Sequence, residues 1–189
     1  MRVIAGKYRS RPLQSLPGLD LRPTADRLRE TLFNVLTAGN PTALEGTVWL
    51  DLYAGTGAVG IEAMSRGASM VYFAELVARA ADLIKTNLTS LEIRTGYQIL
   101  RQDSIRALRA LESGGTAANF VFLDPPYEME DAYIKVLSAL AQSPLLKPET
   151  MVIAEHPKKF DPGEEFASLH RHRKLVQGDA ALSFYRNVQ

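Results

Sequence analysis

The sequence contains no cysteine, one tryptophan and only three histidines among its 189 residues. Without cysteine the chain can form neither a disulfide framework nor a thiolate metal site, and three histidines offer little material for a metal cluster. We therefore expect chemistry that uses no metal. No apolar run approaches the roughly 18 residues that a membrane span needs, and the first residues contain no signal-peptide core. A cytoplasmic location without membrane contact is expected.

The net charge is also small, at +1, but it is unevenly distributed. Basic residues precede the first acidic residue, Asp20, and more follow closely. Such a patch suits a phosphate backbone, although a solvated basic hairpin would have the same composition. A second basic run, His170 to Lys174, lies near the other terminus. The residues that we predict to contact RNA are Arg2, Lys7, Arg9, Arg11, Arg22 and Arg27.

Length and composition, with 46% hydrophobic residues, fit a soluble globular protein with one sizeable core. Residues 1 to 22 consist of short extended pieces interrupted by glycine and proline, which predicts an arm. Thr24 can cap a helix that runs to about Leu36 with one apolar face. We therefore expect a basic arm and helix at residues 1–45, which contacts RNA and packs on the core, and a catalytic domain at residues 46–189.

From Val48 onward, short apolar runs alternate with helical segments. Continuous apolarity in the runs indicates burial on both faces, which predicts a doubly wound α/β fold with a mainly parallel sheet. Two later runs, Leu169–Val176 and Ala181–Val188, predict a closing hairpin around Gly178–Asp179. The other expected strands are Val48–Tyr53, Met70–Ala74, Ile99–Leu100, Phe120–Leu123 and Met151–Ala154, and the helices between them begin near Val59, Ala78, Ser104 and Asp131.

A glycine-rich loop follows the first expected strand and reads Asp51-Leu52-Tyr53-Ala54-Gly55-Thr56-Gly57-Ala58-Val59-Gly60. Glycines there let the backbone approach a nucleotide-like cofactor beyond the carboxyl ends of the strands. Glu75 ends the second strand, where a carboxylate can accept hydrogen bonds from two ribose hydroxyls. These features suit NAD and S-adenosylmethionine equally.

Three acidic features favour S-adenosylmethionine. Asp51 would lie badly beside a pyrophosphate but well beside the cationic amino-acid end of this cofactor. Asp103, after the third strand, can accept a hydrogen bond from the adenine amine, although capping of the next helix is an equally good interpretation. A dehydrogenase has no evident use for the third feature, Asp124-Pro125-Pro126-Tyr127. The predicted cofactor-binding residues are Asp51, Tyr53, Gly55, Gly57, Gly60, Glu75, Asp103 and Ser104.

The segment Asp124-Pro125-Pro126-Tyr127 follows the fourth expected strand and predicts chemistry on a planar amine nitrogen. Two successive prolines stiffen the exit from the strand and leave carbonyl oxygens as acceptors. A carboxylate and a carbonyl can hold both hydrogens of a conjugated amine while its ring stacks on Tyr127. We assign all four residues to catalysis because of their position, although a stiff surface turn would have the same sequence. Guanine N2, adenine N6 and a side-chain amide remain open as targets.

Together these motifs resemble the class I S-adenosylmethionine-dependent methyltransferases, and within them the RsmD-like family of small-subunit (16S) ribosomal RNA guanine-N2 methyltransferases. The resemblance covers nearly the whole chain. It implies a seven-stranded Rossmann-like sheet with one antiparallel strand at its edge, and methyl transfer to the exocyclic N2 amine of a guanine. It also implies an RNA presented with its ribosomal proteins. The matching segments are 2–6, 22–30, 33–34, 50–57, 124–127 and 178–179.

Other functions stay open on the residues alone. An adenine-N6 methyltransferase acting on RNA or DNA would use the same proline segment. An NAD-dependent oxidoreductase would share the glycine loop, but the position of Asp51 counts against it. A catalytically silent RNA-binding module would not need an intact Asp124-Pro125-Pro126-Tyr127. We expect the protein to be a monomer.

Overall fold

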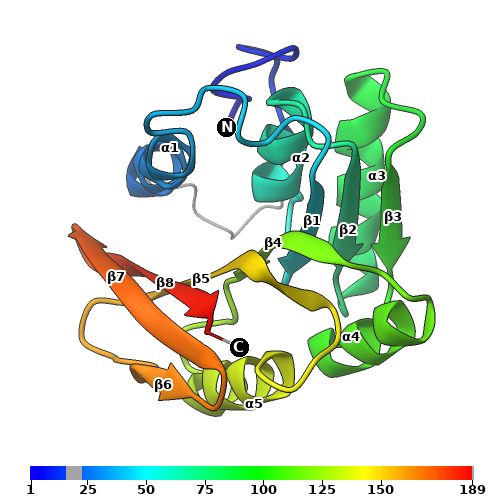
Figure 1. The fold of residues 1–189 in the computed structure, drawn as a ribbon. Coiled ribbons are helices and arrows are strands. Elements are labelled where there is room, and N and C mark those ends of the chain that lie inside the picture. The colour runs from blue at the N-terminus through cyan, green and yellow to red at the C-terminus, as the bar shows by residue number, and fades with distance from the viewer. Residues whose placement is uncertain (16–22, 189) are drawn as a thin grey trace.

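An eight-stranded mixed sheet crosses the molecule in the order β3-β2-β1-β4-β5-β8-β7-β6 (Figure 1). The computed structural model describes residues 1–15 and 23–188. The helices are α1 (Pro23–Leu36), α2 (Ala58–Ser65), α3 (Ala78–Ser90), α4 (Ser104–Ser113) and α5 (Glu130–Leu140). The strands are β1 (Val48–Leu52), β2 (Met70–Ala74), β3 (Tyr97–Leu100), β4 (Ala118–Leu123), β5 (Leu146–Pro157), β6 (Glu165–Phe166), β7 (Leu169–Gln177) and β8 (Ala180–Asn187).

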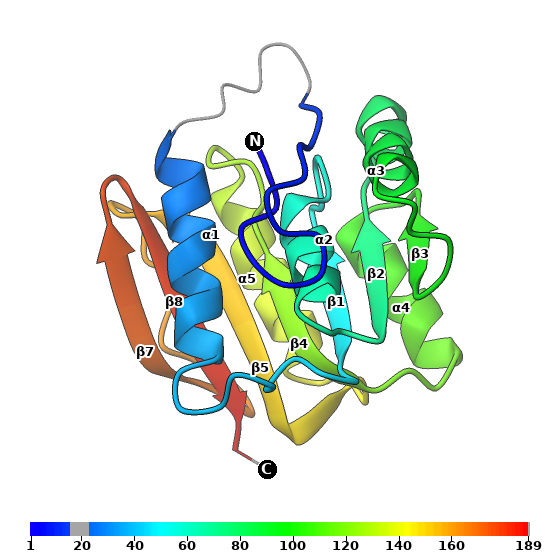
Figure 2. The same cartoon turned by 90° about the horizontal axis from the view of Figure 1, so that it is seen from above.

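Strands β1 to β5 are parallel, as their continuous apolarity predicted. Helices α1, α2 and α3 cover one face of the sheet, and α4 and α5 cover the other (Figures 1 and 2). Two hydrophobic cores result. Phe33, Trp49 and Phe73 belong to the first core, and Val121 and Leu137 belong to the second. No helix in the described part of the chain is long and apolar enough to span a membrane.

The expected count of seven strands is wrong, because the two-residue strand β6 adds an eighth. Such a short strand leaves no periodicity for a sequence to reveal. The expectation of one antiparallel strand at the edge holds in part. The short edge strand β6 is antiparallel to β7, but a second strand that opposes the parallel set, β8, lies inside the sheet between β5 and β7. The closing hairpin itself is confirmed.

Helix α1 packs on the sheet through buried Leu28, Leu32 and Phe33. The ring of Phe33 stacks on Trp49 of β1 with 5.4 Å between centroids. The helical face expected from the apolar spacing is therefore the face that is buried. The structure does not describe the Thr24 side chain, so the predicted cap lies outside the described residues.

The N-terminal arm lies against α2, and side chains of that helix hold its backbone. Glu62 is fully buried and accepts hydrogen bonds from the N–H groups of Ile4 (2.8 Å) and Ala5 (3.0 Å). At Gly6, which has a φ of 81°, an added Cβ would lie 1.9 Å from the carbonyl oxygen of Ser65. Only glycine permits so close an approach to the helix. The arm is therefore built onto the main body rather than extended from it.

Candidate active site

Three of the predicted acidic residues lie at the carboxyl ends of neighbouring parallel strands. Asp51 is in β1, Glu75 follows β2, and Asp124 follows β4. Asp51 pairs with Phe73 on one side and Phe122 on the other, so Glu75 and Asp124 are each two positions beyond its partners. Because side chains alternate along a strand, all three carboxyl groups are directed to the face that α1, α2 and α3 cover.

Asp51 is the most deeply buried member of this cluster, with 1% of its surface exposed. Its Oδ2 accepts a hydrogen bond from the N–H of Gly60 at 2.9 Å. Burial, and to a smaller extent the charges of Asp124 and Glu75, raises the pKa of Asp51 to about 7, although the Gly60 hydrogen bond opposes this shift. A cationic ligand group beside Asp51 would favour its charged form.

The loop between β1 and α2 has a left-handed backbone at Gly55 and Gly57, with φ of 57° and 78°, and also at Tyr53, with φ of 69°. The N–H of Gly55 donates to Oε2 of Glu75, and the N–H of Val77 donates to Oε1, both at 2.8 Å. Backbone donors therefore orient Glu75. Each carboxylate oxygen has a further lone pair with which to accept a ligand hydroxyl.

Gly60 differs from the other two glycines of the motif. It lies in the first turn of α2, where an added Cβ would be 2.3 Å from Cε1 of Phe73. The missing side chain thus permits α2 to pack closely on β2, and the N–H of Gly60 orients Asp51. Direct contact between Gly60 and a cofactor stays a prediction.

Asn87 of α3 connects this loop to the N-terminal arm. Its side chain is fully buried, and Nδ2 donates to the carbonyl oxygens of Thr56 (3.0 Å) and Gln14 (3.1 Å). Its Oδ1 accepts from the N–H of Gln14 at 2.8 Å. No sequence motif pointed to Asn87, because its role depends on three segments that meet only in the folded chain.

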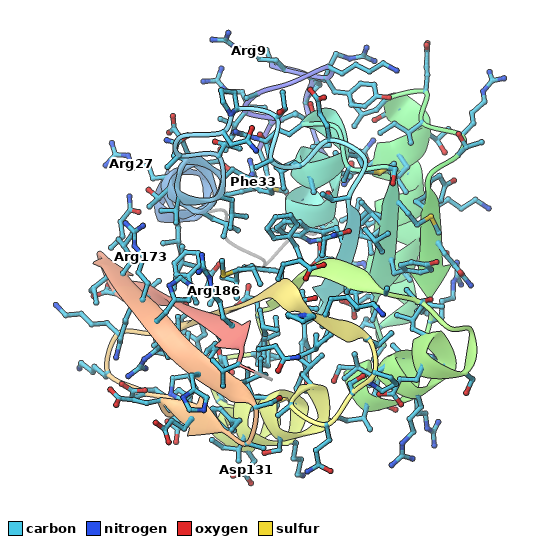
Figure 3. The ribbon with its side chains drawn as sticks, in the orientation of Figure 1. Arg9, Arg27, Phe33, Asp131, Arg173 and Arg186 are labelled. Carbon is cyan, nitrogen blue, oxygen red and sulfur yellow. The ribbon has the colours of Figure 1, made fainter. Side chains whose placement is uncertain are left out.

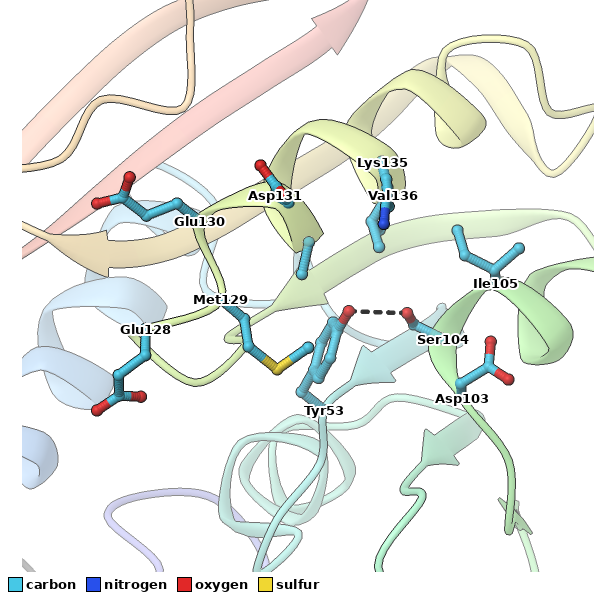
Figure 4. Close-up of a pocket in the computed structure, with 11 residues that line it drawn as sticks. Tyr53, Asp103, Ser104, Ile105, Glu128, Met129, Glu130, Asp131, Lys135 and Val136 are labelled. Atoms are coloured by element: carbon cyan, nitrogen blue, oxygen red, sulfur yellow. Dashed lines mark hydrogen bonds between the residues drawn. The ribbon is translucent and has the colours of Figure 1, made fainter.

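A cleft of about 590 Å³ opens beside Tyr53, between the start of α4 and the start of α5 (Figure 4). Tyr53, Asp103 and Ser104 line one side, and Met129 and Lys135 belong to the other. Ser104 Oγ donates a hydrogen bond to the Tyr53 hydroxyl oxygen at 2.9 Å. Burial raises the pKa of Tyr53. Three predicted cofactor-binding residues therefore share one cleft.

Asp103 caps helix α4, as the alternative interpretation of this residue predicted. Its Oδ1 accepts a hydrogen bond from the N–H of Arg106 at 3.0 Å, and its Oδ2 lies 3.4 Å from Nε of the same arginine. The cap orients the carboxylate at the edge of the cleft. Contact with an adenine amine stays a prediction.

The segment Asp124-Pro125-Pro126-Tyr127 leads from β4 toward α5. Pro125 is buried, whereas Pro126 and Tyr127 are exposed. The carbonyl oxygen of Pro125 accepts a hydrogen bond from the buried hydroxyl of Tyr133 at 3.3 Å. A carbonyl has a second lone pair, so Pro125 can still accept a hydrogen from a ligand. Tyr133 was not predicted, and nothing in the apolar pattern of α5 distinguishes it from a core residue.

Glu155 is a further acidic residue that the sequence interpretation missed. Leu123 of β4 pairs with Ala154 of β5, so Asp124 and Glu155 are the next neighbours along these parallel strands. Burial, and then the charge of Glu155, raises the pKa of Asp124 well above its usual range. The signal was present, because Glu155 directly follows an apolar run, as Asp124 does.

Arg29 brings a positive charge from α1 to this carboxyl pair. It is 6% exposed, and its Nη2 donates to the carbonyl oxygen of Arg2 at 2.7 Å and to Asp26 Oδ1 at 3.1 Å. Burial raises the pKa of Glu155 to about 7, although the charge of Arg29 opposes this shift. Within residues 1–15 and 23–188 the structure records no protein donor to the carboxylate of Asp124 or Glu155, so both can accept hydrogen bonds from a ligand.

The predicted RNA-contact residues lie on the arm and on α1. Their side chains are exposed at Arg2, Lys7, Arg9, Arg11 and Arg27. Figure 3 shows Arg9 and Arg27 directed away from the body of the molecule. Arg11 also has a structural contact, since its Nη2 donates to the carbonyl oxygen of Ser90 at 2.8 Å. Arg22 lies outside the described residues.

Comparison with known proteins places this chain in a family. Residues 1–186 match the model of a family described as "Conserved hypothetical protein 95". The chain belongs to this family. It is the RsmD-like family that the motifs resembled, and its relatives bear corresponding names.

Two curated relatives of this RsmD-like chain match it over nearly its whole length. The "Putative rRNA methyltransferase YlbH" of Bacillus subtilis is 33% identical over 186 residues, which is 98% of each chain. The "Ribosomal RNA small subunit methyltransferase D" of Escherichia coli K12 is 32% identical over 188 residues, which is 98% of this chain and 89% of the relative. A solved structure, the "Putative methyltransferase yhhF from Escherichia coli", has a TM-score of 0.81 at 31% identity and covers 99% of this chain and 97% of its own.

Proposed function

We propose that this protein transfers a methyl group from S-adenosylmethionine to the exocyclic N2 amine of a guanine in small-subunit ribosomal RNA. The observation that carries the proposal is the geometry at the end of β4. There the Asp124 carboxyl group, the Pro125 carbonyl and the exposed Tyr127 ring belong to one short segment beside the buried Asp51. The names of the relatives support an RNA substrate.

The residues around the glycine loop fit S-adenosylmethionine. Asp51 offers a buried carboxylate for the cationic amino-acid end, and Glu75 offers oriented oxygens for ribose hydroxyls. The cleft beside Tyr53 and Ser104 would hold the adenine ring. When bound, this cofactor supplies an electrophilic methyl group on a sulfonium centre.

Asp124 and Pro125 would activate the target amine. The lone pair of an exocyclic amine is delocalised into its ring, which makes the nitrogen a poor nucleophile. Two acceptors that hold both amine hydrogens would orient this lone pair, and positioning of this kind supplies a large part of enzymatic acceleration. The raised pKa of Asp124 also suits it to accept the proton that the nitrogen loses when the N–C bond forms.

Glu155 favours guanine over adenine as the target. Guanine presents three adjacent donor hydrogens, one on N1 and two on N2, whereas adenine places an acceptor, N1, beside its amine. In their charged forms, two neighbouring carboxylates that accept no recorded hydrogen bond from the described residues match the guanine edge, and Glu155 would then repel the N1 lone pair of adenine. Asp124 would hold the N2 amine, and Glu155 would accept the N1 hydrogen.

Tyr127 and the arm would hold the RNA around the target base. Tyr127 is 38% exposed, and its ring can stack on an extruded base, which contributes about 1–3 kcal/mol. Extrusion costs least in a loop or bulge, so an unpaired guanine is the expected target. We further propose that the substrate is a small-subunit particle with its ribosomal proteins.

Product analysis tests the proposed reaction. The protein is incubated with labelled S-adenosylmethionine and either undermethylated small-subunit particles or the naked RNA, and the RNA is then digested to nucleosides. We expect label in N2-methylguanosine, with more label from particles. Label in N6-methyladenosine would instead identify an adenine methyltransferase. The variant Asp124→Asn should bind the cofactor normally and lose nearly all methyl transfer, and near-normal transfer would remove Asp124 from this role.

A base analogue tests the role of Glu155. In 2-aminopurine the 2-amino group is kept, but N1 is an acceptor without hydrogen. The wild type should therefore methylate RNA with 2-aminopurine at the target position far more slowly than the guanine RNA. Glu155→Gln, whose amide can donate to N1, should narrow this gap. If the ratio of methylation rates on the two RNAs is the same for the variant and the wild type, Glu155 does not recognise N1.

A further inference from the structure

The basic run His170 to Lys174 lies in β7, and a β-bulge divides its side chains between the two faces of the sheet. Arg171 pairs with Tyr185 and Arg173 pairs with Phe184, so His172 is the extra residue. Tyr185 belongs to the core beneath α4 and α5, and Phe184 belongs to the core beneath α1, α2 and α3. Residues two apart in a regular strand share a face, but the bulge places Arg171 and Arg173 on opposite faces.

On the face of α5, acidic residues neutralise the basic ones. Arg171 forms ion pairs with Asp161 at 2.6 Å and with Glu164 at 2.9 Å. Lys174 forms an ion pair with Asp161 at 2.8 Å. This face of the hairpin therefore has little net charge to offer a partner.

On the face of α1, the arginine side chains are exposed, whereas His170, which pairs with Arg186, lies 3.7 Å from the carboxylate of Glu165. Arg173 and Arg186 form no ion pair within the described ranges, and the same is true of Arg27 on α1. His172 lies on this face, with Nε2 3.2 Å from the sulfur of Met151. Partial burial, and then the charges of Arg186 and Arg173, lowers the pKa of His172.

These cations occupy one side of the molecule. Figure 3 shows Arg27, Arg173 and Arg186 on the side of the molecule where α1 and the β7–β8 hairpin lie. Leu182 of β8 pairs with Glu155 at the active-site end of β5, and Arg186 is four positions further along β8. This separation is about 13 Å along the strand, at 3.2–3.4 Å per residue. The exposed cations therefore extend away from the site along the last strands of the sheet.

Protection of an edge strand is the competing explanation. Beyond Arg171, whose N–H donates to the carbonyl oxygen of Glu164 at 2.8 Å, strand β7 has no recorded partner on its outer side among the described residues. Charged side chains discourage pairing of such edges between molecules. That role would be met equally by ion-paired and unpaired residues on either face. It does not explain why Arg171 and Lys174 on one face are ion-paired whereas Arg173 and Arg186 on the other are not.

We propose that Arg173, Arg186 and Arg27 bind phosphate groups of the RNA on either side of the target nucleotide. This surface, which we name the hairpin cation surface, adds a second RNA contact to the predicted one on the arm. The inference rests on the proposed function, since it assumes an RNA substrate. Phosphates match isolated arginine side chains that have no acidic partner.

A pair of charge-matched double variants tests the surface. Arg173→Ala/Arg186→Ala removes two cations from the hairpin cation surface. The control, Arg94→Ala/Arg109→Ala, removes two exposed arginines near β3 and α4, at the opposite edge of the sheet. Binding of undermethylated small-subunit RNA is measured for each protein over a range of salt concentrations. Cofactor affinity and thermal unfolding are measured in parallel to verify the fold.

For the hairpin variant, the plot of log binding constant against log salt concentration should be less steep by about 1.4–1.8. Each of the two lost phosphate contacts contributes roughly 0.7–0.9 to this slope. At 0.1 M salt this corresponds to weaker binding on the order of 40-fold. The control should match the wild type, and kcat at saturating RNA should change little in either variant. If the wild type methylates RNA but both variants show the same salt dependence of RNA binding, the inference is wrong. A wild type that methylates no RNA would instead overturn the proposed function.

Discussion

Replacing Asp51 with asparagine should stabilise the protein at neutral and higher pH, by an amount that depends on pH. Asparagine keeps an oxygen acceptor for the N–H of Gly60, so the packing changes little. It removes a buried carboxyl group whose pKa rises from 3.8 to about 7 on folding. This shift of roughly three units corresponds to about 4 kcal/mol, at 1.36 kcal/mol per unit.

The sign follows from proton binding. Between pH 4 and 7 the folded wild type keeps the proton on Asp51, whereas the unfolded chain loses it. Because the folded state then binds more protons than the unfolded state, wild-type stability falls as pH rises through this window. The variant lacks this loss. Its stability relative to wild type should therefore increase between pH 4 and pH 8 by up to about 4 kcal/mol.

Urea unfolding at several pH values measures the difference in the free energy of unfolding between the two proteins. It is calculated from their urea midpoints with the same denaturant slope for both. Carboxyl groups present in both proteins largely cancel in the subtraction. Asp51→Ala serves as a control, because it adds a constant cost from the lost Gly60 hydrogen bond but should show the same dependence on pH. A difference between wild type and Asp51→Asn that is constant from pH 4 to pH 8 would refute the reasoning. The stabilised variant should also bind S-adenosylmethionine poorly.

Three further substitutions test other parts of the structure. Gly60→Ala should lower the free energy of unfolding by about 1–3 kcal/mol, since its Cβ would overlap the Phe73 ring, and an unchanged urea midpoint would contradict this. Glu62→Ala removes the carboxylate that accepts hydrogen bonds from two N–H groups of the arm, and each of these bonds contributes about 1.5–3 kcal/mol. Amide hydrogens of the arm should therefore exchange much faster, while those of the sheet stay protected. Ser104→Ala should raise the pKa of Tyr53 in a spectroscopic titration and weaken cofactor binding several-fold by calorimetry, and an unchanged titration would show that their hydrogen bond is unimportant.

Much of the fold was predictable because local patterns carry it. Strand β2 has the predicted bounds, and helices α3 and α4 begin where the sequence placed them. The acidic residues that end the parallel strands were also predictable, since parallel strands of one sheet present their carboxyl ends at one edge. Glu155 obeys the same rule, and its omission was an error of interpretation rather than a missing signal.

The sequence by itself determined the order of strands and helices, the glycine loop and the chemical character of the segment after β4. Only the tertiary structure decided which groups meet. Pairing of β4 with β5 makes Asp124 and Glu155 neighbours, and one inserted residue in β7 turns Arg173 away from Arg171. Periodicity is a local property of the chain, whereas strand pairing and burial depend on residues far apart in sequence. The pKa values of the buried carboxyl groups and the unpaired cations therefore become visible only in the folded protein.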